Sequence, residues 1–404
     1  MPSLKDYFHL TKDAFDIDPK RDADVYFGYE PLQERLLNRL ASDFVQQRHV
    51  PKFFIFGRYG SGKTHSLAHI QYVLTNDPRF LADFPSTEPL LTEVPPLKAK
   101  ESWKKIHQHL LDEIGRTLIK EAVQAILTTP NFTGDVAADL RAAGALRFGD
   151  TSLQNSQAQI FRNLLFGGLQ ETISWEWLKG KVLTADQAST LNTETNLSET
   201  SDFVAALLNV SALVWAGLRK KIVILLDEAE MVRSITNADS HQEFTWALRR
   251  LMENENDVLG LVVGFQQEGG MEAAPPVFSD DAVRTRVGGD SGFIDLGELV
   301  AEPSDVKDFI VAVLARLVDQ VAAKSTIDTQ ELPTEPEHFP FTPEAIDRIA
   351  EYITEDPERK SPREIKNLMS SAVVAAWLRG RDTGATQLVD SDLLEAVLFP
   401  DEPV

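Results

Sequence analysis

A glycine-rich stretch at residues 57–64 has the residue types and spacing that bind a phosphate chain. It has the form G-x-x-x-x-G-K-T and reads Gly57-Arg58-Tyr59-Gly60-Ser61-Gly62-Lys63-Thr64. Glycine adopts backbone angles that are closed to other residues, so successive N–H groups of such a loop can turn inward around an anion at a helix N-terminus. Lys63 would then reach the β- and γ-phosphates, and the Thr64 hydroxyl would ligate Mg²⁺. The sequence therefore predicts a triphosphate site formed by Gly57, Gly60, Ser61, Gly62, Lys63 and Thr64. The alternative is a tight strand-to-helix turn that happens to contain Lys-Thr.

Two adjacent carboxylates, Asp227 and Glu228, supply the second part of this chemistry. They follow an unbroken aliphatic run at residues 222–226, which is typical of a strand buried on both faces of a parallel sheet. Open α/β sheets bind their ligands at the C-terminal ends of the strands. We expect Asp227 to hold Mg²⁺ and Glu228 to polarise the attacking water. The alternative is a buried strand that ends in a solvated acidic turn, and Glu230 nearby receives no role.

Arg363 is a further candidate residue, and it stands at the start of a helix whose N-terminus is clearly marked in the sequence. Ser361 and Glu364 have the spacing of a capping box, and Pro362 occupies the first helical position. Arg363 therefore falls in the first turn, where the helix dipole disfavours a cation. This placement is explained if a phosphate lies opposite the guanidinium. The alternative is a solvated arginine that is tolerated at a cost of a few tenths of a kcal/mol.

The elements that position these residues follow from hydrophobic periodicity and from the glycines and prolines. Buried strands are expected at residues 53–56, 222–226 and 258–265, and a proline-flanked edge strand at 89–95. Arg284 and Arg286 are expected in a flexible, glycine-flanked stretch. Helices are expected at 32–48, 64–74, 103–127, 203–218, 240–253, 304–321, 343–353, 362–379 and 392–399.

These elements predict an α/β fold with a parallel sheet and three parts along the chain. The parts are an N-terminal arm at 1–30, an α/β core at 31–300 and a helical lid at 301–404. Thr64 and Asp227 are 163 positions apart, which is more than a minimal α/β core needs, so residues 128–200 are interpreted as a helical insertion. Aromatic residues of the arm, including Tyr26 and Tyr29, either cover an adenine ring or pack the arm on the core.

The bulk composition is that of a globular protein with an acidic balance. The chain has 404 residues, 43% of them hydrophobic, and a formal net charge of -22. This charge argues against a broad basic face for nucleic acid. The absence of cysteine excludes disulfides and fits a cytoplasmic protein, and the first residues lack the pattern of a signal peptide. The apolar segment 203–218 is interrupted by polar residues and short for a bilayer, so we expect a buried helix and no membrane association.

Taken together, these motifs resemble the AAA+ ATPases, and within them the origin-recognition and replication-initiator type and related bacterial ATPases. Residues 57–64 look like Walker A, and Leu225-Leu226-Asp227-Glu228 looks like Walker B. Residues 283–287 are similar to the segment that carries the arginine finger, and residues 361–366 are similar to the sensor 2 motif of the lid. The resemblance covers roughly residues 20–400.

The resemblance implies ATP and Mg²⁺ as cofactors, hydrolysis of ATP, and a homo-oligomer. Arg286, or else Arg284, would act on the γ-phosphate of a neighbouring subunit, and Gln266 stands where the family usually has a smaller polar sensor 1 residue. The initiators carry a winged-helix DNA-binding domain after the lid. Here only a few residues follow the last helix, which weakens a DNA-binding interpretation based on that domain.

Three functions compete at this stage. The first is an ATP-driven assembly switch for a protein partner in a bacterial defence or mobile-element system. The second is a DNA-engaging ATPase ring whose channel is lined by Lys98, Lys100, Lys104, Lys105 or residues 219–221, although charge runs of this kind are usually solvated faces. The third, a small-molecule kinase, is disfavoured by Asp227, Glu228 and the helical lid.

Overall fold

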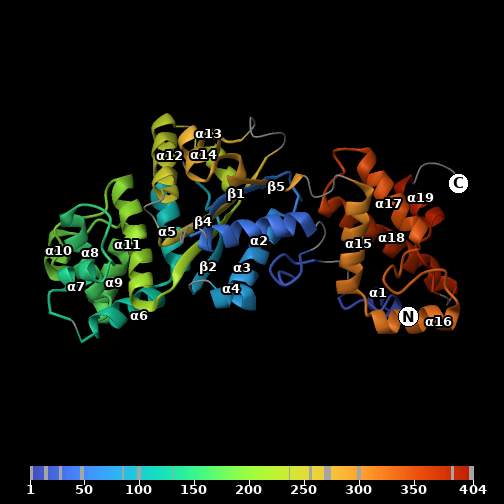
Figure 1. Cartoon of the computed structure of the whole chain (residues 1–404), viewed down its shortest axis with the longest axis horizontal. Coiled ribbons are helices and arrows are strands. Elements are labelled where there is room, and N and C mark those ends of the chain that lie inside the picture. Colours follow the sequence, from blue (N-terminus) through green and yellow to red (C-terminus); the bar gives the residue numbers. More distant parts are fainter. Residues whose placement is uncertain are drawn as a thin grey trace. The chain divides into compact units, whose positions relative to one another are not determined.

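The computed structural model of the chain forms two compact units. It describes residues 3–12, 17–26, 30–45, 50–83, 86–97, 102–130, 132–235, 237–253, 257–267, 274–297, 302–383 and 386–399. Unit 1 comprises Met1–Leu36, Gly57–His69 and Asp295–Val404, and unit 2 comprises Leu37–Phe56 and Ile70–Ile294. Figure 1 colours both units along the chain and labels their helices and strands where there is room.

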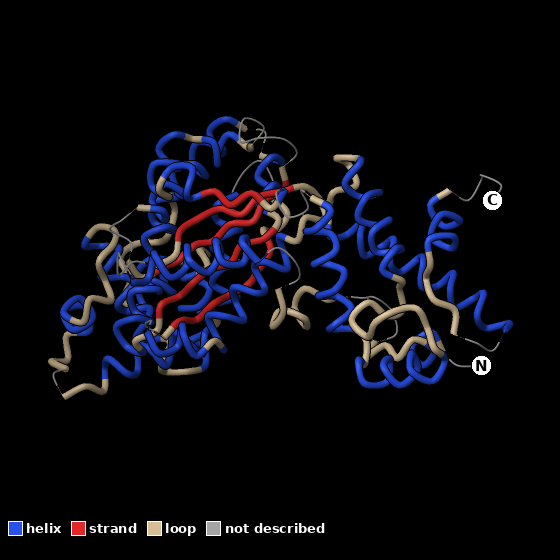
Figure 2. The backbone as a smooth tube through the Cα atoms, turned by 45° about the vertical axis from the view of Figure 1, so that its right-hand side comes forward, coloured by secondary structure: helices blue, strands red, loops and turns tan. Residues whose placement is uncertain are grey.

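A five-stranded sheet forms the centre of unit 2, and Figure 2 shows its strands gathered together among helices. The strand order is β2-β3-β4-β1-β5, and the pairs β2–β3 and β3–β4 are parallel. The strands are β1 (Lys52–Gly57), β2 (Thr87–Glu93), β3 (Lys221–Asp227), β4 (Leu259–Gln266) and β5 (Phe293–Asp295). Every residue of β1 and β3 is buried, as their unbroken apolar runs require. The expected α/β fold with a parallel sheet and β2 at its edge is confirmed.

The predicted buried helix ahead of β3 is also confirmed. It is α11 (Thr200–Leu218), which packs against α5 (Ser102–Ile114) and α6 (Arg116–Leu127). Gly217 permits a close approach, since a Cβ atom there would lie 2.3 Å from the carbonyl oxygen of Ala122. In the described part of the chain, α11 is the one helix long and apolar enough to cross a membrane, but 67% of its apolar window is buried within the protein.

Short helices occupy the segment between α6 and α11, as expected for residues 128–200 (green in Figure 1). Trp177 is fully buried among them and donates a hydrogen bond from Nε1 to the carbonyl of Thr195. Asp150 and Thr184 cap two of these helices by accepting backbone N–H groups. The helices are α7 (Val136–Ala142), α8 (Thr151–Asn163), α9 (Gly168–Leu178) and α10 (Ala185–Leu191).

Two predicted helices are wrong in their bounds, because each is interrupted in the structure. The helix expected at 103–127 is two helices, α5 and α6, because Gly115 between them has a φ of 81° that no helix interior allows. The helix expected at 304–321 ends early, as α15 (Pro303–Leu317). Val318 is extended, and Asp319 caps the next helix, α16 (Gln320–Gln330).

Unit 1 joins the N-terminal arm to the C-terminal helices. Leu10 forms an antiparallel bridge with Val318, and the Thr11 amide donates to the Leu317 carbonyl at 2.7 Å. Figure 1 shows α1 (Leu4–Tyr7) close to this helical group, and α1 packs against α18 (Pro362–Thr383). The other helices of the group are α17 (Pro343–Glu355) and α19 (Ser391–Leu398).

The remaining elements connect those already described. They are α2 (Glu30–Val45), α3 (Lys63–Asn76), α4 (Pro78–Asp83), α12 (Ala238–Met252), α13 (Pro276–Ser279), α14 (Asp281–Arg286) and two 3₁₀ helices (Ala229–Ser234 and Gly289–Gly292). The helices predicted at 32–48, 64–74 and 240–253 correspond to α2, α3 and α12. The helices predicted at 343–353, 362–379 and 392–399 correspond to α17, α18 and α19.

Candidate functional site

The glycine loop connects the end of β1 to the start of α3 in a conformation that requires its glycines. Gly60 and Gly62 have φ angles of 81° and 94°, which side-chain-bearing residues rarely adopt. At Gly57 the need is for space, because a Cβ atom there would lie 2.5 Å from the Ser61 hydroxyl oxygen. α3 begins at Lys63, so the free N–H groups of a helix terminus lie at the end of the loop.

Two further observations are those expected of a loop that binds a phosphate chain. The Ser61 hydroxyl is buried and has no hydrogen-bond partner in the described protein, and leaving such a group unpaired costs about 1–3 kcal/mol. A polar ligand atom would remove that cost. The Lys63 ammonium donates to the carbonyls of Gly57 at 3.1 Å and Arg58 at 2.9 Å, so it lies against the loop it is predicted to serve.

Arg363 lies against the same loop, and its role toward a phosphate stays a prediction. Its guanidinium carbon is 4.5 Å from the centre of the Tyr59 ring, and its aliphatic stem covers Gly60. Ser61 and Arg363 thus belong to one unit with the loop glycines. The cap of α18 is present, because the Glu364 amide donates to the Ser361 hydroxyl at 3.2 Å.

The N-terminal arm holds the first turns of α3. The Tyr26 hydroxyl is 3.0 Å from the Ser66 hydroxyl, and the Tyr26 ring lies 5.1 Å from the His69 ring. The imidazoles of His65 and His69 bond to the carbonyls of Val25 and Ala23, both at 2.8 Å. Burial raises the pKa of Tyr26 and lowers that of His65. Tyr26 therefore packs the arm on α3, whereas Tyr29 lies outside the described residues.

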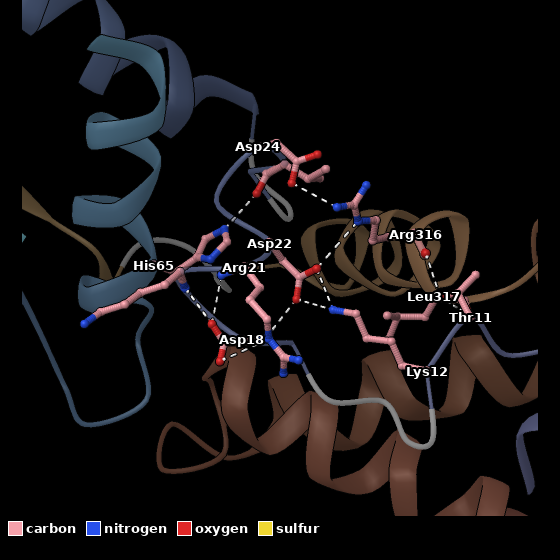
Figure 3. A network of polar contacts seen from close by, with 11 residues as sticks. Thr11, Lys12, Asp18, Arg21, Asp22, Asp24, His65, Arg316 and Leu317 are labelled. Carbon is pink, nitrogen blue, oxygen red and sulfur yellow. Dashed lines mark hydrogen bonds and ion pairs between the residues drawn. The ribbon is translucent and has the colours of Figure 1, made fainter. Parts of the chain in front are cut away.

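A buried carboxylate ties this arm to the C-terminal helices (Figure 3). Asp22 is 1% exposed and pairs with the Lys12 ammonium at 2.5 Å and the Arg316 guanidinium at 3.6 Å. Arg316 also contacts Asp24 at 3.0 Å. Burial alone would raise the pKa of Asp22, but Lys12, the Asp18 amide and Arg316 together hold it below its ordinary value. The sequence carried no periodic signal for this cluster.

In unit 2, the predicted carboxylates stand at the end of β3. Asp227 is 3% exposed, and its carbonyl accepts the Val94 amide at 3.0 Å. Glu228 is exposed and adopts the left-handed region, with a φ of 54° and a ψ of 35°, while its amide donates to Asp227 Oδ1 at 2.9 Å. A non-glycine residue in this region costs about 1–2 kcal/mol. Strained residues of this kind cluster at active sites.

Gln266 is the last residue of β4 and is hydrogen-bonded to Glu230, for which the sequence predicted no role. The backbone N–H of Gln266 donates to Glu230 Oε2 at 2.8 Å. Glu230 lies in the 3₁₀ helix after β3, so its carboxylate fastens that turn to the end of β4. The sequence showed Glu230 two residues after Glu228 and predicted the strand at 258–265, but it did not show that the two are joined.

Arg284 and Arg286 lie in helix α14, so the expectation of a flexible loop is wrong for them. The helix forms because Asp280 caps it by accepting the amides of Ala282 and Val283. Arg284 pairs with Asp290 at 2.5 Å. Arg286 donates to the Ala282 carbonyl at 2.8 Å and lies 3.5 Å from Glu253. Both arginines therefore have surface partners within unit 2, and their finger role stays a prediction.

Magnesium would be held by oxygen ligands, and the Thr64 hydroxyl and the Asp227 carboxylate are of that type. Within the described ranges, no group of three or more His, Asp or Glu side chains could hold a metal by itself. Mg²⁺ usually binds through one or two carboxylates together with substrate phosphates. The metal assignment of Thr64 and Asp227 stays a prediction.

Comparison with known proteins gives similarity in structure but not in sequence. No protein-family model and no curated protein matches the sequence. The ORC1 protein of Aeropyrum pernix in complex with DNA is 12% identical, with a TM-score of 0.44, over 94% of this chain and 67% of that chain. The ORC2 protein of the same organism (ADPNP-ADP complexes) is 12% identical, with a TM-score of 0.48, over 97% of this chain and 72% of that chain.

Proposed function

We propose that this chain is an ATPase of the AAA+ initiator type that binds ATP with Mg²⁺ and hydrolyses it. The observation that carries the proposal is the glycine loop at 57–64. It combines two positive-φ glycines, a buried Ser61 hydroxyl without a partner, and Arg363 lying against Gly60. A mere strand-to-helix turn needs neither the unsatisfied hydroxyl nor the arginine.

The roles of the residues follow from their chemistry. The loop amides and Lys63 bind the phosphates, Thr64 and Asp227 hold the metal, and Arg363 neutralises charge from the lid side. Bound Mg²⁺–ATP supplies the phosphoanhydride bond and the charge that the metal screens. Glu228 orients the attacking water and accepts its proton. The left-handed backbone of Glu228 sets the direction in which this side chain leaves the main chain.

We further propose that ATP controls the assembly of a cytoplasmic homo-oligomer that acts on a protein partner in bacterial defence or mobile-element control. Arg286 or Arg284 would reach the γ-phosphate bound by the neighbouring subunit. Supporting this, Arg284 lies in a surface helix and pairs with Asp290, whose side chain is 90% exposed, so a change of partner there costs little.

The DNA-engaging alternative receives less support from the described side chains. Arg219 and Lys221 lie over the Trp215 ring, and Lys220 pairs with Glu88 at 3.1 Å. These cations therefore already have partners. Lys98 and Lys100 lie outside the described residues. The net charge of -22 also opposes nonspecific binding to nucleic acid.

Nucleotide binding and turnover test the proposal directly. Lys63→Ala should lower ATP affinity at least tenfold, because a cation at the phosphates is lost. Glu228→Gln should retain ATP but lose about 10²-fold or more in hydrolysis, the range for a general base. Unchanged affinity in Lys63→Ala refutes the ATP site. With ATP present, Glu228→Gln should run as an oligomer in size-exclusion chromatography, and a monomer there refutes the assembly switch.

A further inference from the structure

Two positions of the glycine loop that the loop motif does not specify contact the turn before α18 and the first turn of α18 itself. Arg58 donates a hydrogen bond to the carbonyl of Pro357 at 2.8 Å, and the Tyr59 ring faces Arg363. In phosphate loops the glycines, the lysine and the hydroxyl residue bind the phosphates, whereas the residues between the first two glycines have no fixed chemistry. The contacts of Arg58 and Tyr59 therefore serve something other than the phosphates directly.

The loop contacts the Arg363 side chain from its Cβ atom to its guanidinium group. A Cβ atom on Gly60 would lie 2.8 Å from Arg363 Cβ and 3.2 Å from Cδ, so the stem lies directly on the glycine. The guanidinium carbon is 4.5 Å from the Tyr59 ring centre, which is stacking distance for an arginine on an aromatic face. Within the described residues, Arg363 forms no ion pair with a carboxylate.

Core packing does not explain the tyrosine. Tyr59 is 66% exposed, so its ring removes little apolar surface from water. The contribution of a large aromatic side chain in an exposed tight loop therefore comes mainly from its contacts. Here the Tyr59 ring contacts Arg363, the cation that the proposed function assigns to the phosphates.

We propose that Tyr59 is a positioning residue that fixes the Arg363 guanidinium beside the glycine loop before the nucleotide binds. The proposal rests on the function proposed above, because it concerns the same triphosphate site. An arginine side chain has several rotatable bonds, and holding it in one place beforehand removes that ordering cost from the binding step. Stacking at an exposed site is weak, so the expected gain in affinity is about two- to fivefold.

The measurement is the affinity for Mg²⁺–ATP and for Mg²⁺–ADP, with KM and kcat determined on the same proteins. Tyr59→Ala should weaken ATP binding two- to fivefold and raise KM by the same factor while kcat changes less. Tyr59→Phe keeps the ring and should behave as the wild type. Tyr72→Ala, which removes another partly exposed tyrosine at 38% exposure, is the matched control and should change nothing.

A double-mutant comparison separates positioning from a merely structural role. If Tyr59 acts through Arg363, Tyr59→Ala should have no further effect once Arg363→Ala is present. Full additivity in the double variant, or a Tyr59→Phe protein as weak as Tyr59→Ala, overturns the proposal. Wild-type protein that binds no ATP would overturn the proposed function as well. Wild-type binding together with an unaffected Tyr59→Ala protein would overturn the positioning role alone.

Discussion

Alanine at the two positive-φ glycines of the loop should have different costs, because only one of them faces Arg363. Gly62 has a φ of 94° and open space where a Cβ atom would go. Gly62→Ala should therefore cost only the backbone term, about 1–2 kcal/mol of unfolding free energy. Gly60→Ala pays a similar term at a φ of 81° and also places its Cβ atom 2.8 Å from Arg363 Cβ.

The extra cost at Gly60 cannot be relieved by rotating the arginine. Carbon atoms pack best about 3.5–4.0 Å apart, so the two Cβ atoms must separate by roughly 1 Å. Arg363 Cβ is fixed by the backbone of α18, so the loop or the helix start has to move. Overpacking of this kind typically costs about 1–3 kcal/mol. Gly60→Ala should therefore lose about 2–5 kcal/mol in total.

The assay is urea unfolding without nucleotide, combined with hydrogen exchange of peptides covering 57–69 and 362–383 so that unit 1 is followed separately. Arg363→Gly removes the opposing Cβ atom, and in that background Gly60→Ala should cost only as much as Gly62→Ala. Equal losses for the two single alanine variants, or a coupling between positions 60 and 363 below about 0.5 kcal/mol, would refute the close packing of Arg363 on the loop.

Three other perturbations test separate parts of the structure. Glu228→Gly should stabilise the protein by about 1 kcal/mol in urea melts, because glycine accepts the left-handed backbone, while ATP hydrolysis falls sharply; a destabilised variant would contradict the strain. Burial lowers the pKa of His107 to about 4, so only the unfolded chain takes up its proton between pH 6.5 and 4. Stability should drop by about 2 kcal/mol from pH 7 to pH 5, and His107→Gln should abolish that part of the drop; an unchanged pH slope would argue against it. Asp22→Asn should cost about 2–3 kcal/mol at pH 7 through its lost bonds to Lys12 and Arg316, and less as acid protonates the wild-type carboxyl, which comparison of melts at pH 7 and pH 3 can check.

The sheet could be predicted from the sequence because burial on both faces leaves an unmistakable pattern. The runs at 53–56, 222–226 and 258–265 contain almost no polar residue, and each is a strand in the structure. Helix ends were less predictable. Gly115 was visible, but only its positive φ shows that the helix expected at 103–127 breaks there.

The candidate site was predictable where a motif is contiguous and not where it depends on distant pairs. The strand-to-helix loop at 57–64 could be predicted from the order of its residues alone, since a tight loop defines its own geometry. The stacking of Tyr59 on Arg363 joins residues about 300 positions apart, and no spacing rule links them. Arg284 and Arg286 were expected in a loop from their flanking glycines, whereas in the structure Asp280 caps a helix that contains both.

The discontinuity of unit 1 has a consequence for synthesis on the ribosome. All residues of unit 2 have been made once Ile294 is added, whereas Asp22 and Asp24 in the arm cannot form their ion pairs until Arg316 has been made. At about 5–20 residues per second, the nearly 300 residues between them take roughly 15–60 s to be made. A nascent chain therefore carries a glycine loop without Arg363, and the proposed ATP site should be complete only after the last helices have emerged.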